Sequence, residues 1–423
     1  MTDKNSSDCC TGPGLMPMEQ AMALMQQQVN VVVKTEKVSV EDALDRVLAE
    51  DVYSEINVPP ADNSAMDGYA FRAEDKAFAD NLKLIGKSMA GHPFDGQVNQ
   101  GECVRIMTGA QVPVGADTVM MQENTHADGD SIKILTWPEQ GNSIRRAGED
   151  VKQGDKVMPK GTRLSPVDLG LIASLGLAQI HVFKKIKVAV MASGDELVRA
   201  GGQLPAGGIY ESNSLVTLSV LKRLNVETRD MGIVADNMDD TIAAFKEAMS
   251  WADVLITSGG VSVGDADYIK DVLEQLGSIG FWKLAIKPGK PFAFGELSND
   301  GSDHCQFFGL PGNPVSATVT LHRLVLPVLK MMQGEVLKES FVFKIPIKQA
   351  VKRKAGRLEF QRATLNKNEA GEYEVDLFRS QSSGVLSSMS ESNGYVIIDE
   401  DVEQVEAKES VNFMPFGCFI GRQ

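Results

Sequence analysis

The chain of 423 residues contains little cysteine and little histidine. The five cysteines are an odd, scattered set without the paired spacing of a zinc site: Cys9, Cys10, Cys103, Cys305 and Cys418. A disulfide framework is not expected in a chain of this length. We interpret them as thiols of a reducing cytoplasm, although the adjacent pair Cys9 and Cys10 leaves metal binding or oxidation open. The five histidines also lack ligand-like spacing, so we assign none of them a catalytic or metal role.

The sequence lacks an apolar run of the roughly 18 residues needed to cross a bilayer, and its polar start has no signal-peptide core. Its formal net charge of −15 argues against a nucleic-acid binder, which needs clustered Lys and Arg. We therefore expect a cytoplasmic protein that binds neither membranes nor nucleic acids. A small anionic ligand would be repelled at long range, so cations and helix N-termini must attract it locally.

The pattern of elements predicts a multidomain protein of α/β plus β class. Helices are expected at 16–29 and at 40–48, the second with Ser39 as N-cap. Short alternating runs at 68–72, 82–89, 102–107, 118–122 and 131–135 predict β-strands, and strands alternate with helices from residue 184 onward. We predict a disordered tail (1–14), an elongated mixed N-terminal domain (15–60 with 139–183), a β-rich insert (61–138), a central α/β domain with a mainly parallel sheet (184–333) and a C-terminal β-barrel-like domain (338–423).

A strand followed by a glycine-rich turn is the most informative local pattern. The apolar run 254–257 leads into Ser258, Gly259 and Gly260, where the backbone can approach a ligand with no Cβ in the way. The next helix would turn unpaired N–H groups toward an anion. Asp265 and Asp267 would repel that anion unless a cation lies between them, so the pattern indicates a phosphorylated ligand with Mg²⁺.

Two other strand–helix junctions carry similar turns, at 192–197 and at 309–315, and Asp236 follows a further strand. Pro314 suits the first position of a helix, so free N–H groups are expected after it. Each junction alone is more simply a tight turn with a helix cap. Their convergence at the carboxyl edge of one parallel sheet favours a ligand site. The P-loop and dinucleotide-binding glycine motifs are absent.

The segment 281–292 is predicted to form a ribbon in which Lys283 and Lys287 share one face, because they lie four residues apart. The alternative is that both lysines are ordinary solvated side chains with no role in ligand binding. Polar loops at 62–70 and 105–110 could be turns held by side-chain hydrogen bonds. Paired arginines precede Asp150 at 145–150, where the chain leaves the β insert.

Taken together, the segments 62–69, 107–110, 146–150, 193–197, 258–264 with Asp267, 287–291 and 310–314 resemble the MoeA family in order, over a match running from Met16 to Gly417. These are the molybdopterin molybdenumtransferases, related to the C-terminal part of gephyrin. The resemblance implies that the α/β domain is of the molybdopterin-binding type. It also implies conversion of adenylylated molybdopterin and molybdate to molybdenum-loaded molybdopterin, with release of AMP and a requirement for Mg²⁺.

The resemblance assigns roles to residues. Substrate binding falls to Ser193, Gly194, Ser258, Gly259, Gly260, Pro311, Gly312, Asn313 and Pro314, with Asp150, Arg362 and Ser383 bordering the cleft. The Mg²⁺ candidates are Asp195, Glu196, Asp236 and Asp267. Catalytic roles are implied for Asp67, Thr108, Glu196, Asp236, Asp267, Lys283 and Lys287, of which the lysines would neutralise molybdate or the charge that develops as the phosphoanhydride breaks.

The family implies an elongated homodimer, with the molybdopterin adenylyltransferase and molybdoenzyme maturation proteins as further partners. Glu211 departs from the family pattern, where Asp is common, and is left out of the site. Two alternatives stay open. A molybdopterin adenylyltransferase would resemble 184–333 alone and would need neither β domain. A non-catalytic scaffold, a role gephyrin also has at synapses, would not need the acidic and lysine-bearing rim.

Overall fold

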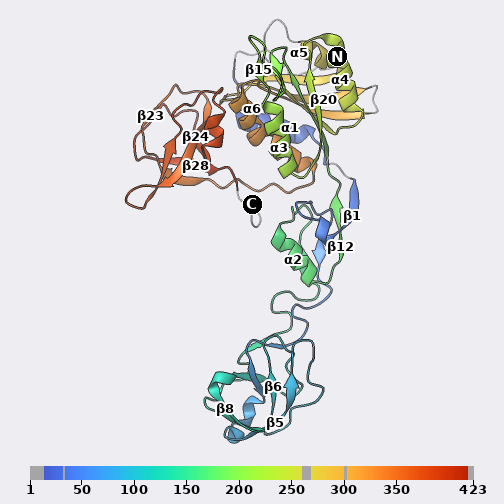
Figure 1. Ribbon diagram of the computed structural model, residues 1–423, viewed down its shortest axis with the longest axis vertical. Helices are drawn as coiled ribbons and strands as arrows, with labels where there is room; N and C mark the ends of the chain where they lie inside the picture. Colours follow the sequence, from blue (N-terminus) through green and yellow to red (C-terminus); the bar gives the residue numbers. More distant parts are fainter. Residues whose placement is uncertain (1–13, 32–33, 260–267, 300–302, 418–423) are drawn as a thin grey trace, which may run out of the picture. The chain divides into compact units, whose positions relative to one another are not determined.

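The computed structural model describes residues 14–31, 34–259, 268–299 and 303–417, and it divides into two compact units (Figure 1). Unit 1 comprises Met1–Ala49, Gly161–Val167 and Ile180–Gln423; unit 2 comprises Glu50–Lys160 and Asp168–Gln179. The predicted tail, apart from Gly14, and the residues Cys9, Cys10, Gly260, Asp265, Asp267 and Cys418 lie outside the described residues.

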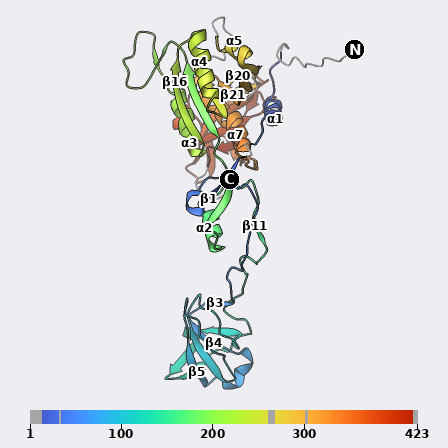
Figure 2. The same ribbon diagram turned by 90° about the vertical axis from the view of Figure 1, so that its right-hand side faces the viewer.

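Unit 2 contains a six-stranded sheet in the order β7-β4-β6-β5-β9-β8 (Figure 2). Its strands are β4 (Gly68–Phe71), β5 (Leu82–Ser88), β6 (Glu102–Ile106), β7 (Thr118–Met121), β8 (Thr125–Asp128) and β9 (Ser131–Ile134). The five strands expected from alternation are confirmed. The sixth, β8, was missed because its residues Thr-His-Ala-Asp are largely exposed and carry no apolar period. Phe71, Leu82, Cys103 and Ile132 form the core on one side of the sheet.

Shorter elements complete unit 2. Strand β2 (Val52–Tyr53) pairs with β11 (Lys156–Met158), and β3 (Asn63–Ser64) pairs with β10 (Ile144–Arg145). The 3-10 helices η2 and η3 span Ala73–Phe78 and Gln122–Asn124. Helix α2 (Pro166–Ser174) begins at a proline, a residue that suits the first position of a helix, and it spans the sequence boundary between the two units.

The central sheet of unit 1 has the order β16-β13-β17-β21-β20-β18. Strands β16 (Glu227–Val234), β13 (Lys187–Ser193), β17 (Val254–Ser258) and β21 (Asp303–Leu310) are parallel, whereas β20 (Pro291–Asn299) and β18 (Gly277–Lys283) form an antiparallel edge. The mainly parallel sheet is thus a mixed sheet. Two small strands, β14 (Leu197–Val198) and β15 (Ile209–Tyr210), pair beside it.

Helices cover both faces of this sheet because its inner parallel strands β13 and β17 are buried on both sides. Val188, Val190 and Ile256 face α1 (Met18–Gln28), α3 (Asn213–Arg223) and the continuous helical run α6 (Pro314–Thr320), η4 (Leu321–Val325) and α7 (Leu326–Met332). The alternate residues, such as Met191 and Leu255, face α4 (Met238–Met249) and α5 (Tyr268–Leu276). Figures 1 and 2 show these helices packed around the sheet.

The run Pro314–Met332 is long and apolar enough to cross a membrane by composition, with a mean hydropathy of 1.2. However, 61% of it is buried, and Val315, Leu324 and Val328 belong to the core of unit 1. Among the residues described, this is the single run that meets the length and composition test, and its packing identifies it as a core helix.

The C-terminal part of unit 1 forms a second sheet, in the order β19-β24-β26-β28-β22 with β25 beside β24. Its strands are β22 (Phe343–Pro346), β24 (Leu358–Lys367), β25 (Tyr373–Leu377), β26 (Gly394–Ile398) and β28 (Ser410–Pro415). Strand β23 (Val351–Lys352) pairs with β27 (Gln404–Val405), and α8 spans Ser387–Ser390. Strand β19 (Ile286–Lys287) pairs with β24, although its neighbours in sequence belong to the central sheet.

This crossover corrects the prediction that Lys283 and Lys287 share one face of a ribbon. Lys283 ends β18 in the central sheet, whereas Lys287 lies in β19 of the C-terminal sheet. The peptide between Lys287 and Pro288 is cis. Four-residue spacing implies a common face only within one continuous strand, and here the strand ends between the two lysines.

The helix predicted at 40–48 is also wrong. Strand β1 (Thr35–Ser39) pairs with β12 (Gln179–Phe183), and a single 3-10 turn, η1 (Val40–Asp42), follows. Ser39 does cap that turn, since its hydroxyl oxygen accepts a hydrogen bond from the Asp42 N–H at 3.2 Å. Beyond it, Val47 and Leu48 bridge to Arg163 and Val182, so pairing with distant segments replaces the helix.

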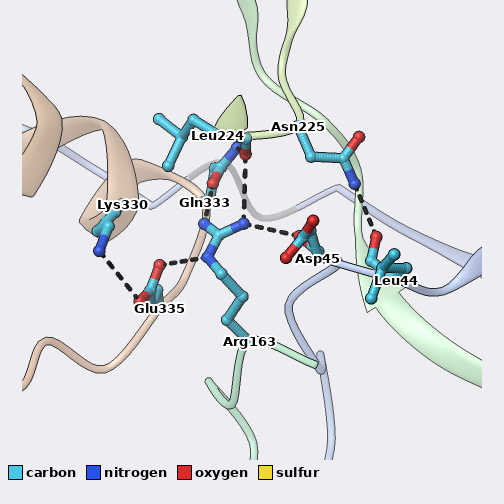
Figure 3. Close-up of polar contacts among 8 residues, drawn as sticks. All are labelled: Leu44, Asp45, Arg163, Leu224, Asn225, Lys330, Gln333 and Glu335. Carbon is cyan, nitrogen blue, oxygen red and sulfur yellow. Dashed lines mark hydrogen bonds and ion pairs between the residues drawn. The ribbon is translucent and has the colours of Figure 1, made fainter. Parts of the chain in front are cut away.

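Arg163 holds several segments of unit 1 together (Figure 3). Its guanidinium donates to the carbonyl oxygens of Asp45 (2.6 Å) and Leu224 (3.2 Å), to the Gln333 side chain, and to Glu335 at 2.7 Å. Both charged side chains are mostly buried, 17% and 15% exposed. This single side chain therefore joins the ends of α3 and α7 to the loop at Asp45.

Candidate active site

The carboxyl ends of β13 and β16 are joined by hydrogen bonds between polar side chains. Ser193, the last residue of β13, donates from its hydroxyl to the Asp236 carboxylate, and the Asp236 N–H donates to Asp195 Oδ1 at 3.2 Å. Ser193 is buried, whereas Asp236 is exposed just beyond β16. Two acidic residues predicted to lie at one edge of the sheet are thus joined there, through the Asp195 carboxylate and the Asp236 backbone.

The glycine turn after β17 lies against the same edge. Gly259 has a φ of +89°, and its N–H donates to the Leu310 carbonyl at 3.2 Å. A Cβ at this position would stand 2.6 Å from the Ser193 carbonyl oxygen, a distance that real side chains do not tolerate. The turn therefore requires glycine both for its backbone angle and for its close approach to β13.

The turn after β21 lies beside the Gly259 turn. A Cβ on Gly312 would be 3.9 Å from Gly259 Cα, with no nearer atom outside its own chain neighbours. Asn213, the first residue of α3, donates from Nδ2 both to Ser258 Oγ and to the Gly312 carbonyl oxygen, at 2.8 Å each. The three glycine-bearing junctions and Asp236 therefore come together, as their convergence on one sheet edge predicts.

Gly194 and Glu196 also belong to this edge. Gly194 has a φ of +152°, and a Cβ there would lie 2.8 Å from Glu196 Oε2. The Glu196 carboxylate thus folds back over the turn, while its carbonyl accepts the N–H of Ile209 in β15 at 2.8 Å.

The N-terminus of α6 is only partly available to a ligand. Pro314 is its first residue and Asn313 its N-cap, as predicted, but the Val315 N–H donates to the Ser383 carbonyl oxygen at 3.0 Å. The expectation that the N–H groups after Pro314 are free is therefore wrong for Val315. The same bond brings Ser383, from the C-terminal part of unit 1, to the edge of the site next to Pro311 and Gly312.

Arg362 lies beneath this loop and does not reach the surface, since it is 1% exposed. It donates to the Ser388 hydroxyl at 3.1 Å and to the Ser382 carbonyl at 3.2 Å. Burial lowers the pKa of its guanidinium to about 10, so it stays charged at neutral pH. Its observed contacts support the loop that carries Ser383.

Lys287 is paired with a buried carboxylate. Its Nζ lies 3.0 Å from Glu359 Oε1; the lysine side chain is 43% exposed, whereas that of Glu359 is 3% exposed. Glu359 also meets Arg353 Nε at 3.1 Å and accepts from Gln361 at 2.8 Å. Burial alone would raise the pKa of Glu359, but hydrogen bonds from Gln361 and Lys287 and the nearby cations outweigh it and keep that pKa below its usual value. Lys283 is exposed at the end of β18.

The carboxylates at this edge fit a Mg²⁺ ion that phosphate oxygens of a bound ligand would also help to hold. Among the residues described, no group of three or more His, Cys, Asp or Glu side chains is placed to hold a metal ion. Asp195 and Asp236 provide two adjoining carboxylates, and Mg²⁺ commonly uses one or two carboxylates together with substrate phosphate oxygens.

The remaining predicted residues belong to unit 2. The backbone N–H and the hydroxyl of Thr108 both donate to Asp67 Oδ1 at 2.7 Å. These hydrogen bonds hold the pKa of the Asp67 carboxyl below its usual value, so it is ionised at neutral pH. Asp150 is exposed, and its N–H donates to the Val58 carbonyl at 3.0 Å.

Sequence reasoning missed two residues of the site in unit 1. Asn213 is of a residue type common at helix starts, and Glu359 has no motif that distinguishes it from other strand residues. Glu211, left out as a departure from the family, accepts the Ser214 N–H at 2.7 Å and so caps α3. The signal that could have found Asn213 is its place at the start of a helix that begins at the ligand edge of the sheet.

Comparisons with known proteins agree with this arrangement. Three family models match in order: the MoeA N-terminal region (domain I and II) over residues 16–176, a probable molybdopterin binding domain over 189–331, and the MoeA C-terminal region (domain IV) over 344–416. A molybdopterin molybdenumtransferase of Haemophilus influenzae is 43% identical over 409 residues, which cover 96% of this chain and 100% of the relative.

Two further relatives extend the match. A molybdopterin molybdenumtransferase of Bacillus subtilis is 33% identical over 391 residues, 90% of each chain. The crystal structure of a molybdopterin biosynthesis MoeA protein from Pyrococcus horikoshii aligns with a TM-score of 0.82 at 30% identity, covering 95% of this chain and 100% of that one. The chain therefore belongs to the MoeA family and, like its curated relatives, is a transferase.

Proposed function

We propose that the protein is a molybdopterin molybdenumtransferase that inserts molybdate into adenylylated molybdopterin and releases AMP, with Mg²⁺ required. The observation that carries this proposal is the junction of the Gly259 and Gly312 turns, bridged by Asn213, at the sheet edge where the Asp195 carboxylate accepts the Asp236 N–H. Backbone free of Cβ atoms suits the phosphate groups, and the carboxylates suit a cation that those phosphates share.

The residues at this edge divide the chemistry between them. The turns at Ser258–Gly259 and Pro311–Gly312 hold the phosphorylated end of the pterin, and Ser193 keeps the Asp236 carboxylate in place. Asp195, Glu196 and Asp236 hold Mg²⁺, which neutralises phosphate charge when bound. Lys287, fixed by Glu359, and Lys283 offset the negative charge of molybdate and of the departing AMP. Asp267 and Gly260 are assigned to the same site from the family pattern.

The localisation, the oligomeric state and the protein partners are also proposals. We infer a cytoplasmic homodimer whose partners include the molybdopterin adenylyltransferase and proteins of molybdoenzyme maturation. Sedimentation of the purified protein tests the dimer: a monomer at micromolar concentration contradicts it.

The decisive experiment combines the purified protein with adenylylated molybdopterin, molybdate and Mg²⁺, and follows AMP and molybdenum-loaded product together. We expect AMP release to need all three components. Asp236→Asn keeps the shape of the side chain but removes its charge, so it should abolish release while the protein stays folded. Asp239→Asn, an equal change of charge on the exposed first turn of α4, is the matched control.

An adenylyltransferase would give a different result. Accumulation of adenylylated molybdopterin from molybdopterin and ATP, without a second enzyme, would contradict the proposal. Full activity of both Asp236→Asn and Asp267→Ala would refute the roles given to these carboxylates.

A further inference from the structure

Asn213 makes an unusual pair of hydrogen bonds for a residue at the start of a helix. One nitrogen, Nδ2, donates to Ser258 Oγ on the turn after β17 and to the Gly312 carbonyl on the turn after β21, both at 2.8 Å. The amide NH₂ carries two donors on one atom, so both of its hydrogens are used in this bridge. A side chain on α3 thus ties together two turns that are far apart in sequence.

The position of Asn213 is itself fixed by the fold. The Glu211 carboxylate accepts the Ser214 N–H at 2.7 Å, and the Glu211 N–H donates to the Val198 carbonyl at 2.9 Å. Thr217 and Leu221 bury α3 against the central sheet. The bridge therefore starts from a rigid helix end and not from a mobile loop.

The bridged turns follow neighbouring strands, because β17 pairs with β21 up to Ser258 and Leu310, so the bridge sets only the spacing of the residues beyond that pair. The Gly259 N–H donates to the Leu310 carbonyl at 3.2 Å, near the upper limit for such bonds, and Gly312 brings no side chain to the contact. Because both turns present bare backbone, any change in their spacing changes how phosphate oxygens fit between them.

We propose that Asn213 is a positioning residue that sets the spacing of the Ser258–Gly259 and Pro311–Gly312 turns and thereby the affinity for the phosphorylated end of the pterin substrate. This inference rests on the proposed function and adds to it a residue outside the glycine turns and the carboxylates. Asn213 acts through the backbone of the two turns and needs no contact with the reacting atoms.

The test compares Asn213→Asp and Asn213→Ala with Ser219→Ala. Asp preserves the shape of the side chain but replaces both donors with an acceptor, and a negative charge in the first turn of α3 suits the helix dipole. The Asp variant therefore separates the bridge from any role in helix stability. Ser219→Ala removes a hydroxyl that bonds to the Leu215 carbonyl within the same helix, away from both turns.

The measurements are the Kd for molybdopterin by anaerobic titration calorimetry, the KM and kcat of AMP release, and the thermal midpoint. The loss of two neutral hydrogen bonds should raise Kd and KM about tenfold. We expect this increase in Asn213→Asp and in Asn213→Ala, with kcat changed less than KM. The thermal midpoint should be unchanged in Asn213→Asp, and Ser219→Ala should have wild-type values throughout.

The outcomes separate this inference from the proposed function. Wild-type affinity in both Asn213 variants, or retained affinity in Asn213→Asp alone, would overturn the bridge even if AMP is released normally. If the wild-type protein binds molybdopterin and the variants bind it more weakly, but no AMP is released, the inference stands and the proposed reaction fails. A wild-type protein that binds no molybdopterin would overturn both.

Discussion

The substitution Gly259→Ala perturbs the site at the point where the structure leaves least room. The residue has a φ of +89°, and a Cβ would lie 2.6 Å from the Ser193 carbonyl oxygen. The unfavourable backbone angle costs about 1–2 kcal/mol, and forcing a methyl group into a packed contact typically costs about 1–3 kcal/mol more. We therefore expect the free energy of unfolding to fall by about 2–5 kcal/mol.

The same substitution should affect activity through Ser193. Restoring an ordinary contact of at least 3.4 Å requires the introduced methyl group and the Ser193 carbonyl to separate by about 1 Å, and Ser193 holds the Asp236 carboxylate. Misplacing catalytic groups by about 1 Å can cost about a hundredfold in rate. The assays are urea-induced unfolding and the rate of AMP release.

Two glycines provide matched controls. Gly312→Ala meets no atom closer than 3.9 Å and has no positive φ, so it should leave stability unchanged and weaken only phosphate binding. Gly170→Ala lies within α2 with no atom within 4 Å, and it should stabilise that helix by about 0.5–1 kcal/mol. Wild-type stability and rate in Gly259→Ala would refute the steric reasoning, as would equal destabilisation by Gly312→Ala.

Three further predictions concern unit 1. Burial lowers the pKa of His322 from 6.5 to about 4, so between pH 6.5 and pH 4 the unfolded chain binds more protons than the folded protein. The free energy of unfolding should therefore fall by up to about 3 kcal/mol as the pH drops from 6.5 to 4. His322→Gln should remove this part of the pH dependence in unfolding titrations. Lys287→Met should slow AMP release at least tenfold while costing at most about 1 kcal/mol of stability, because the lysine is 43% exposed; an equal loss with exposed Lys352→Met would contradict a specific role. Arg163→Ala should lower the free energy of unfolding by about 3 kcal/mol, since it removes four hydrogen bonds and leaves the partly buried Glu335 with Lys330 alone at 3.8 Å; a loss below about 1 kcal/mol would show that the contacts in Figure 3 contribute little.

Local sequence patterns predicted those strands in which the order of apolar and polar residues matches the order of buried and exposed positions. Strand β9 of unit 2 alternates buried and more exposed residues, and strands β13 and β17 of unit 1 are largely apolar and buried on both faces, so both kinds were recognisable. The helix expected at 40–48 and the ribbon at 281–292 failed for one reason. In each case pairing with a distant segment, 163 and 182 or strand β24, decided the local structure, and no nearby residue signals that pairing.

The same distinction separates the site residues that were found from those that were missed. Glycine turns after apolar strands carry a local signal, and it becomes specific when several of them converge on one edge of a sheet. Asn213 and Glu359 act across space on turns and cations that other elements supply. Their residue types are ordinary at a helix start and within a strand, so only the fold shows what they contact.

The local charge at the site follows from one shared carboxylate. The chain carries a formal net charge of −15, yet Glu359 lies within 3.1 Å of nitrogen atoms on Lys287 and Arg353, and its charge also favours the charged form of Arg362. These four residues together hold two positive charges in excess. Because Arg353 and Arg362 are almost fully buried, solvent screens their charge less than it would screen surface lysines. An acidic protein can thus attract an anion to the Ser383 loop, provided that the C-terminal sheet keeps β19 and Lys287 in place.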